Sequence, residues 1–214
     1  MKSSIELIRL IAVILIVFTH TRNELEYGVA YFIVEQIPTF GTAILSIISG
    51  YLYFEISRHK HNLFFKKIKS LAIPYLIANI SVLILVFLTY YITGYNPLNR
   101  FDYDLSLLIE GLFSLNSPPI NPPTYFIRDI FIIFSIIALV TQREFKTLFV
   151  IMPFLLFGTL ILRLDVAFLF LIGILFSKYK SLIGKKYLII ITTLISLVFS
   201  VFFTAFIKFP VSFL

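Results

Sequence analysis

The chain of 214 residues is 59% hydrophobic and only 14% charged, which excludes an ordinary soluble domain. It contains no cysteine, so a disulfide framework and a cysteine-based metal site are also excluded. The formal net charge of +7 could suit an anionic partner, but in so apolar a chain the positions of the charges matter more than their sum. We expect an all-α, polytopic transmembrane helical bundle of about seven helices, surrounded by membrane lipids and not bound to nucleic acid.

The first apolar segment, Ile5 to Thr21, is hydrophobic enough for a membrane and yet carries Glu6, Arg9 and His20. On a helix, His20 returns to within roughly 20° of Arg9, about 16 Å further along the axis. Glu6 precedes Arg9 at the i,i+3 spacing that lets opposite charges meet. Two interpretations stay open: a polar stripe facing a protein interior or watery cavity, and a snorkelling Arg9 paired with Glu6 beside an interfacial His20. No small-x-small cleavage site follows, so we expect a retained helix.

Further apolar segments follow the first along the chain. They cover residues 37–56, 71–93, 125–140, 147–162, 166–178 and 187–209. The segment 166–178 is short against the roughly 20 residues that a bilayer needs. The longest loop, 94–124, holds an amphipathic piece at 105–115 and a proline-dense run. Because no internal repeat or low-complexity linker interrupts the chain, we expect one membrane-embedded domain over residues 1–214.

Lysine and arginine gather in alternate loops, which predicts the orientation in the membrane. One side holds Lys2, the loop 58–69, Arg143 with Lys146, and the loop 178–186. The other side holds only Arg22, Arg100, Arg163 and Lys208, with Arg128 near the start of a span. We therefore expect a cytoplasmic N-terminus in a multi-pass protein of a plasma membrane, with Arg9 toward the cytoplasm and His20 toward the outside.

The stretch from Arg58 to Lys69 is the most basic in the chain, and Lys66, Lys67 and Lys69 lead into the third span. These cations could only fix the topology and touch anionic lipid headgroups, at about 1 kcal/mol per charge. Alternatively they form a phosphate-binding surface, since phosphorylated ligands need several converging cations. The two histidines of this stretch are spaced i,i+2 and do not share a helix face, so we expect no metal site.

Four motifs in this order resemble the integral-membrane acyltransferase-3 family, which acylates cell-surface polysaccharides and related glycans. They are Glu6-x-x-Arg9 followed after ten residues by His20; Ser49-Gly50-Tyr51-Leu52; Phe65-Lys66-Lys67-Ile68-Lys69 leading to Ile73-Pro74-Tyr75; and Pro123-Thr124-Tyr125-Phe126-Ile127-Arg128-Asp129. Each motif alone is weak, but together and in order they are fairly specific. The motifs fall within the first 180 residues of the chain.

The chain also departs from the family pattern. Lysines stand at positions 66, 67 and 69, where the family commonly has arginines, so the bidentate guanidinium fork is lost while the charge is kept. Tyr125 stands where the family usually has tryptophan. The family also has more helices than we count here. We therefore expect a member that lacks the family's last helices: a naturally short protein, a degenerate copy or a fragment.

The resemblance implies an acyl-CoA-dependent O-acyltransferase of a bacterial plasma membrane. Its donor substrate would be acetyl-CoA, or another short acyl-CoA, arriving from the cytoplasm, with no bound cofactor and no metal. Its acceptor would be a hydroxyl of a surface glycan or lipid-linked sugar. In this reading Arg9, oriented by Glu6, contacts the donor. His20 acts as general base on the acceptor hydroxyl or takes the acyl group transiently, because a neutral imidazole suits proton removal near neutral pH.

The same resemblance assigns donor binding to Lys66, Lys67 and Lys69, which would attract the CoA phosphates. Ser49 and Gly50 could let the donor approach closely, or could simply mark a site where helices pack.

On the acceptor side, the resemblance suggests that Tyr125 and Arg128 line the site. Arg128 could equally be an interfacial anchor paired with Asp129. Two other classes of protein stay open as well. One is a non-catalytic or exporter-like component of surface-polysaccharide assembly, or an inactive short family member. The other is an unrelated transporter, for which the sequence has neither a pair of broken helices nor repeat symmetry.

Overall fold

The structure is a computed structural model of the chain. It describes residues 2–20, 29–95, 105–157 and 163–180, and among these residues it contains helices and connecting turns but no strand. The expected all-α fold is therefore confirmed for this part of the chain. The expected span at 187–209 lies outside the described residues, as do positions 158–162 of the fifth span.

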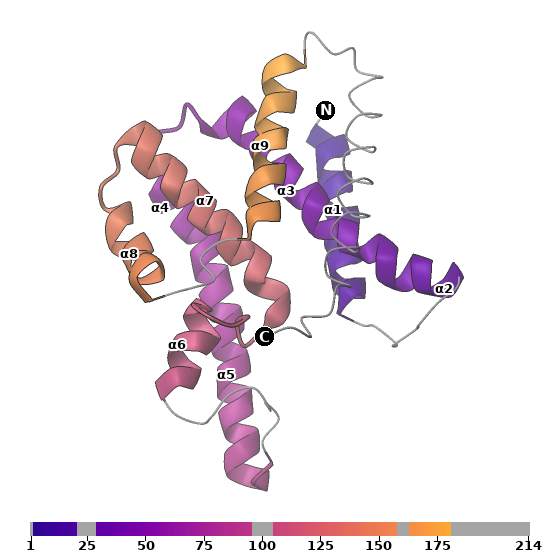
Figure 1. Cartoon of the computed structure of the whole chain (residues 1–214), viewed down its shortest axis with the longest axis vertical. Coiled ribbons are helices and arrows are strands. Elements are labelled where there is room, and N and C mark those ends of the chain that lie inside the picture. Colours follow the sequence, from indigo (N-terminus) through magenta and orange to yellow (C-terminus); the bar gives the residue numbers. More distant parts are fainter. Residues whose placement is uncertain (1, 21–28, 96–104, 158–162, 181–214) are drawn as a thin grey trace, which may run out of the picture. The chain divides into compact units, whose positions relative to one another are not determined.

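The chain divides into two compact units. Figure 1 labels their helices along the chain. Unit 1 comprises Met1–Ser57 and Phe168–Leu214, and unit 2 comprises Arg58–Ala167. The single domain expected over residues 1–214 stays a prediction.

Unit 1 is built around the pair of helices α1 (Lys2–Thr19) and α3 (Phe40–Leu52), which pack along each other. The side of α1 that faces α3 is closely packed, because a Cβ atom on Gly41 would lie only 2.6 Å from the carbonyl oxygen of Ala12. Helix α3 belongs to one helical run, formed by α2 (Val29–Tyr31), a π turn, a 3-10 turn, α3 and a second π turn that ends at Ser57. This run begins earlier than the expected span at 37–56, and a 3-10 turn accommodates Pro38 within it.

Unit 2 contains the longest helical run of the described residues. It consists of α4 (Leu63–Lys67), a π turn (Ile68–Ala72) and α5 (Ile73–Thr93). The π turn ends at Ala72, and its last hydrogen bond runs from the Ile73 N–H to the carbonyl of Ile68. Pro74, which has no N–H to donate, lies in the first turn of α5. The run ends at Gly94, whose φ of 69° allows the left-handed C-cap.

The remaining helices of unit 2 are α6 (Leu105–Phe113), α7 (Tyr125–Gln142) and α8 (Thr147–Phe157). Helix α7 is the core element, and its residues from Phe126 to Ser135 are nearly all buried. Two apolar clusters contain residues of α7 and α5. They comprise Phe64, Phe131 and Ala138 in one, and Leu83, Val86, Leu107 and Ile120 in the other.

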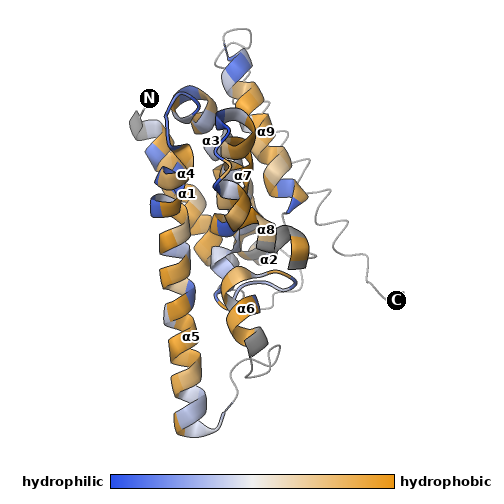
Figure 2. Cartoon of the chain, turned by 90° about the vertical axis from the view of Figure 1, so that its left-hand side faces the viewer, coloured by the Kyte–Doolittle hydropathy of each residue, from blue (hydrophilic) through white to orange (hydrophobic). Residues whose placement is uncertain are grey.

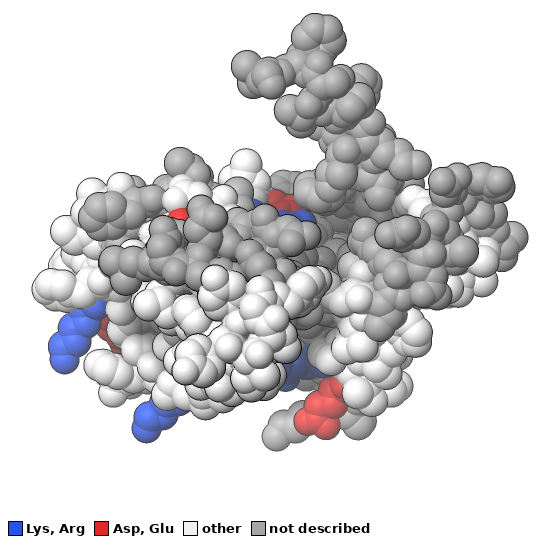
Figure 3. All heavy atoms as spheres, turned by 90° about the horizontal axis from the view of Figure 1, so that it is seen from below, with Lys and Arg blue, Asp and Glu red and all other residues white. Residues whose placement is uncertain are grey.

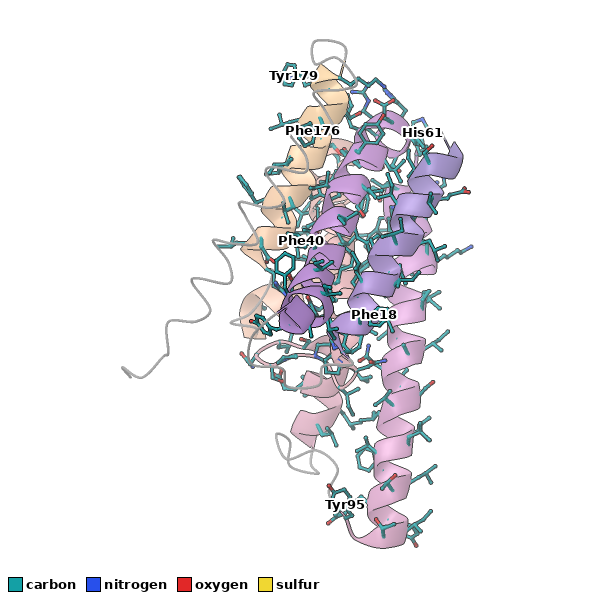
Figure 4. The ribbon with its side chains drawn as sticks, turned by 90° about the vertical axis from the view of Figure 1, so that its right-hand side faces the viewer. Phe18, Phe40, His61, Tyr95, Phe176 and Tyr179 are labelled. Atoms are coloured by element: carbon teal, nitrogen blue, oxygen red, sulfur yellow. The ribbon has the colours of Figure 1, made fainter. Side chains whose placement is uncertain are left out.

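The helix at 63–93 corrects one expectation, because the third span was expected to begin at residue 71. The basic positions 65–69 lie on a helix and not in a loop. The chain leaves the preceding turn at Asn62, which adopts the left-handed conformation with φ of 57°. His61 and Tyr95 mark the two ends of this run (Figure 4).

Among the described residues, three helical runs are long and apolar enough to cross a membrane: Phe32–Ser57, Leu63–Thr93 and Pro122–Gln142. They correspond to the second, third and fourth expected spans, and α5 is apolar along most of its length (Figure 2). On the face seen in Figure 3, the described atoms are mostly uncharged, with a few separate charged side chains. The fold is that of an integral membrane protein.

Two glycines let α3 and the C-terminal part of α9 (Leu164–Tyr179) approach backbone to backbone within unit 1. A Cβ atom on Gly50 would lie 1.9 Å from the carbonyl oxygen of Phe170, and one on Gly173 would lie 2.0 Å from that of Ile47. Small residues permit this kind of contact in membrane proteins. A side chain at either position would therefore push the two helices apart.

We predict that Gly173→Ala destabilises the protein by about 3 kcal/mol or more, because the added methyl group meets a backbone carbonyl that cannot rotate away. Thermal unfolding of the purified protein in detergent measures the effect. Gly111→Ala is the matched control, since its Cβ atom would meet the side chain of Ile120 at an ordinary 3.4 Å. Equal melting temperatures for the two variants would contradict the prediction.

Candidate functional site

The first motif, with Glu6, Arg9 and His20, lies on α1 and in the turn directly after it. Glu6 and Arg9 are exposed on the helix, and His20 is the exposed residue that directly follows it. The His20 N–H donates to the Val17 carbonyl at 3.0 Å, so the helical path continues to the histidine. The common face of Arg9 and His20 stays a prediction, because α1 ends at Thr19 and His20 lies in the turn that follows. Their catalytic roles stay predictions.

The spacing of Glu6 and Arg9 permits an ion pair, but the pair is not formed. Within the part of the chain that the structure describes, these two side chains make no salt bridge. The proposed orientation of Arg9 by Glu6 is thus not a contact of this structure. Both groups lie exposed beside the face that packs on α3.

The second motif occupies the crossing of α3 and α9. Gly50 is buried against the backbone of Phe170, and Ser49 is half-buried beside it. Gly50 therefore lies where two helices pack, which is one of the two roles expected for it. The role of Ser49 and Gly50 in donor binding stays a prediction. One turn further, Glu55 accepts hydrogen bonds from the Ser177 hydroxyl and, at 2.6 Å, from the Lys180 ammonium.

The three lysines of the third motif do not share one side of their helix. Lys66 and Lys69 are exposed, and the Lys66 ammonium donates to the His61 carbonyl at 3.1 Å. Lys67 is half-buried, and its ammonium lies 3.7 Å from the centre of the Phe134 ring, a cation–π contact. Lys67 is thereby directed toward α7, which separates it from the other two.

The last residue of α7 and the loop that follows it contact the start of helix 63–93. The Gln142 side chain accepts from the N–H of Leu63 at 3.4 Å and donates to the Lys60 carbonyl at 3.0 Å. The Glu144 carboxylate accepts from the N–H of Phe64 at 3.2 Å. These bonds satisfy amide groups that have no partner within the helix itself. Sequence analysis did not identify them, because no local pattern signals a cap supplied from a distant part of the chain.

The fourth motif supplies a buried ion pair. Arg128 and Asp129 are 4% and 0% exposed, and Asp129 Oδ1 accepts from Arg128 Nε at 2.9 Å and from Nη2 at 2.6 Å. Arg128 Nη1 also donates to Ser114 Oγ at 2.7 Å and to its carbonyl oxygen. Asp129 Oδ2 is buried without a hydrogen-bond partner among the described residues. Arg128 does pair with Asp129, but inside unit 2 and not as an interfacial anchor.

Tyr125 is half-buried beside this pair and packs against a second one. The Arg163 guanidinium carbon lies 4.8 Å from the centre of the Tyr125 ring. Arg163 bonds to both carboxylate oxygens of Asp165, at 3.1 Å and 2.6 Å. The Asp165 side chain is the partner that holds Arg163 over the aromatic ring. Tyr125 and Arg128 lie one turn apart on α7, and Arg163 with Asp165 lies beside Tyr125. The acceptor-side role of Tyr125 and Arg128 stays a prediction.

A buried asparagine links the same region to α5. Asn79 donates to the Thr124 hydroxyl at 2.9 Å and accepts from the N–H of Asn121 at 3.0 Å. It is a polar residue within the apolar run 71–93, which is the one sequence signal that could have identified it. Nearby, Tyr75 donates to the Leu112 carbonyl at 2.8 Å. The described residues contain no group of three or more His, Cys, Asp or Glu that could hold a metal ion.

Glu110 orders the turn after α6. Its carboxylate accepts from the N–H and the side-chain amide of Asn116, at 2.8 Å and 2.7 Å, and from the N–H of Ser117 at 3.2 Å. Partial burial acts to raise the pKa of Glu110, but the hydrogen bonds from Asn116 and Ser117 outweigh it and lower the pKa below its ordinary value of 4.5.

Because its pKa is lower in the folded state, the ionised Glu110 stabilises the fold at all pH values above about 4.5. That contribution disappears as the pH falls through the lowered pKa that Glu110 has in the folded state. We predict that Glu110→Gln flattens the loss of melting temperature between about pH 6 and pH 3. Ser81→Ala, which removes an exposed hydroxyl on α5, serves as the control. An unchanged pH profile in Glu110→Gln would show that this carboxylate does not contribute.

Comparison with known families identifies the class of protein. The family model described as an acyltransferase domain matches residues 2–212. The chain belongs to the acyltransferase-3 family and is a membrane acyltransferase. The match extends beyond the first 180 residues, which hold all four motifs. Comparison with curated proteins and with solved structures gives no match.

Proposed function

We propose that the protein transfers an acetyl or other short acyl group from acyl-CoA to a hydroxyl of a cell-surface glycan or lipid-linked sugar. The observation that carries this proposal is a membrane acyltransferase that exposes Arg9 on its first helix and His20 directly after that helix. A cation and an imidazole are the groups that such a transfer needs, because the thioester must be positioned and a hydroxyl proton removed.

In the proposed reaction, the acceptor hydroxyl oxygen attacks the thioester carbonyl carbon of acyl-CoA. A ring nitrogen of His20 takes the hydroxyl proton as the new C–O bond forms. The C–S bond then breaks, and the CoA thiolate leaves and takes up a proton. A covalent route, in which His20 first carries the acyl group, produces the same ester and the same thiol.

The donor is assigned to the cytoplasmic side of the membrane. Arg9 contacts the donor, and Lys66 and Lys69 supply exposed cations for the CoA phosphates. Lys67 contributes less in this proposal, because its ammonium is directed to the Phe134 ring. Tyr125 and Arg128 belong to the acceptor side, where Arg128 acts through the buried pair with Asp129.

The proposed location is a bacterial plasma membrane, which the chain crosses several times with its N-terminus in the cytoplasm. The support is the distribution of lysine and arginine between alternate loops.

We predict that His20→Ala lowers acyl transfer by about 100-fold or more, because general-base catalysis typically contributes that much. The measurement is incorporation of labelled acetyl groups from acetyl-CoA into surface glycan, at equal levels of membrane-inserted protein. His59→Ala, an exposed histidine outside the proposed machinery, should leave the rate unchanged. Full activity of the His20 variant would remove this residue from the mechanism.

The topology gives a separate prediction, because the chain has no cysteine of its own. A single cysteine at Ser57 should react with an impermeant thiol reagent only after the cells are opened. A cysteine at Asn99 should react in intact cells. The opposite pattern would invert the proposed orientation and place Arg9 on the wrong side for a cytosolic donor.

A further inference from the structure

The start of helix 63–93 presents an aromatic ring among cations, all within unit 2. Phe65 is 48% exposed, although it is a large apolar residue. Lys66 follows it directly, and Lys69 lies one turn further on the helix. The ammonium of Lys146, from the loop between α7 and α8, lies 5.5 Å from the centre of the Phe65 ring.

Phe64 explains why the Phe65 ring is held at the surface. The Phe64 side chain is only 3% exposed and stacks on Phe131 of α7 in the core, with 6.1 Å between the ring centres. Its ring also meets that of Phe65 edge to face at 5.8 Å. The buried ring therefore supports the Phe65 ring, about half of whose residue surface stays exposed.

Lys146 comes from a different part of the sequence, and capping bonds hold its loop in place. Gln142 and Glu144 both bond to the first amides of helix 63–93. These bonds tie the loop to the same helical turn that carries Phe65. Two hydrogen bonds thus support the juxtaposition of Lys146 with the ring.

We propose that Phe65 and Lys146 complete the binding site for the acyl-CoA donor. The Phe65 ring stacks on the adenine base, and Lys146 contacts a phosphate together with Lys66 and Lys69. This inference rests on the proposed function. It gives a role to Phe65, which the third motif contains without a role, and to Lys146, which lies outside the four motifs.

The chemistry of the ligand matches these groups. CoA joins an adenine ring to a diphosphate and a 3′-phosphate, and bases stack on aromatic side chains regardless of their sequence context. Lysine contacts a phosphate as a point charge and lacks the fork of arginine, so an additional cation compensates for weaker individual contacts. Because Lys67 is directed to Phe134, Lys146 restores a third cation beside Lys66 and Lys69.

Lipid headgroups offer the same phosphate chemistry, but they carry no adenine. Pantetheine lacks both the adenine and the phosphates of CoA. Comparing the binding of CoA and of pantetheine therefore distinguishes a CoA site from a site for lipid headgroups. The full-length protein is placed in nanodiscs of phosphatidylcholine, so that anionic headgroups do not compete, and the dissociation constants are measured by calorimetry.

We expect Phe65→Leu and Lys146→Gln each to raise the Kd for CoA about fivefold or more, with no change in any weak binding of pantetheine. Leucine keeps the apolar bulk but loses the aromatic face. The double variant Lys66→Gln, Lys69→Gln is the reference for loss of phosphate contacts. The matched controls are Tyr179→Leu and Lys178→Gln, because Lys178 lies 5.2 Å from the exposed Tyr179 ring in the same kind of contact. These controls should bind CoA as the parent does.

Each outcome has a distinct meaning, provided that the variants keep the melting temperature of the parent. If Phe65→Leu or Lys146→Gln binds CoA like the parent, that residue is removed from the site. If both do so while the Lys66 and Lys69 double variant binds weakly, the inference fails and the proposed donor stands. If the parent itself does not bind CoA, the proposed donor is wrong, and this inference falls with it.

Discussion

The buried ion pair of Arg128 and Asp129 is the interaction on which unit 2 depends. Burying two charges is costly, and their attraction offsets this cost only where the geometry is good and further hydrogen bonds are made. Here Arg128 also bonds to Ser114, which ties the start of α7 to the turn after α6. Loss of one partner from such a pair typically costs about 3–5 kcal/mol, since the other charge stays buried. The surrounding turns are therefore held to α7.

A second set of polar contacts extends this arrangement along α5. Asn79 connects α5 to Asn121 and Thr124, and Tyr75 connects it to Leu112. In an apolar environment an unsatisfied polar group is expensive, so the partners of these side chains determine which turns can lie against the helix. The proline-dense stretch before α7 is thereby held in one conformation beside the residues assigned to the acceptor side.

Polar contacts also hold the first turn of helix 63–93. Its first amides are capped by Gln142 and Glu144, and the exposed cations and aromatic ring lie directly beside this cap. The exposed cations thus lie at one end of this membrane-length helix, and the buried polar contacts of Tyr75 and Asn79 lie near its middle. In the proposed function, the cationic end is the part of the helix that meets the donor.

The sequence by itself indicated the second, third and fourth spans and the spacing of Glu6, Arg9 and His20, because apolar runs and residue spacing are local properties. It did not indicate that the third span begins at Leu63. It also carried the family motifs, which the family match confirms as a whole. Only the tertiary structure decided that Gly50 packs against Phe170, that Lys67 is directed away from Lys66, and that Lys146 reaches Phe65. Each of these depends on a contact with a residue outside the local motif. Helical periodicity specifies the face on which a side chain lies, but the neighbouring element decides what that face meets.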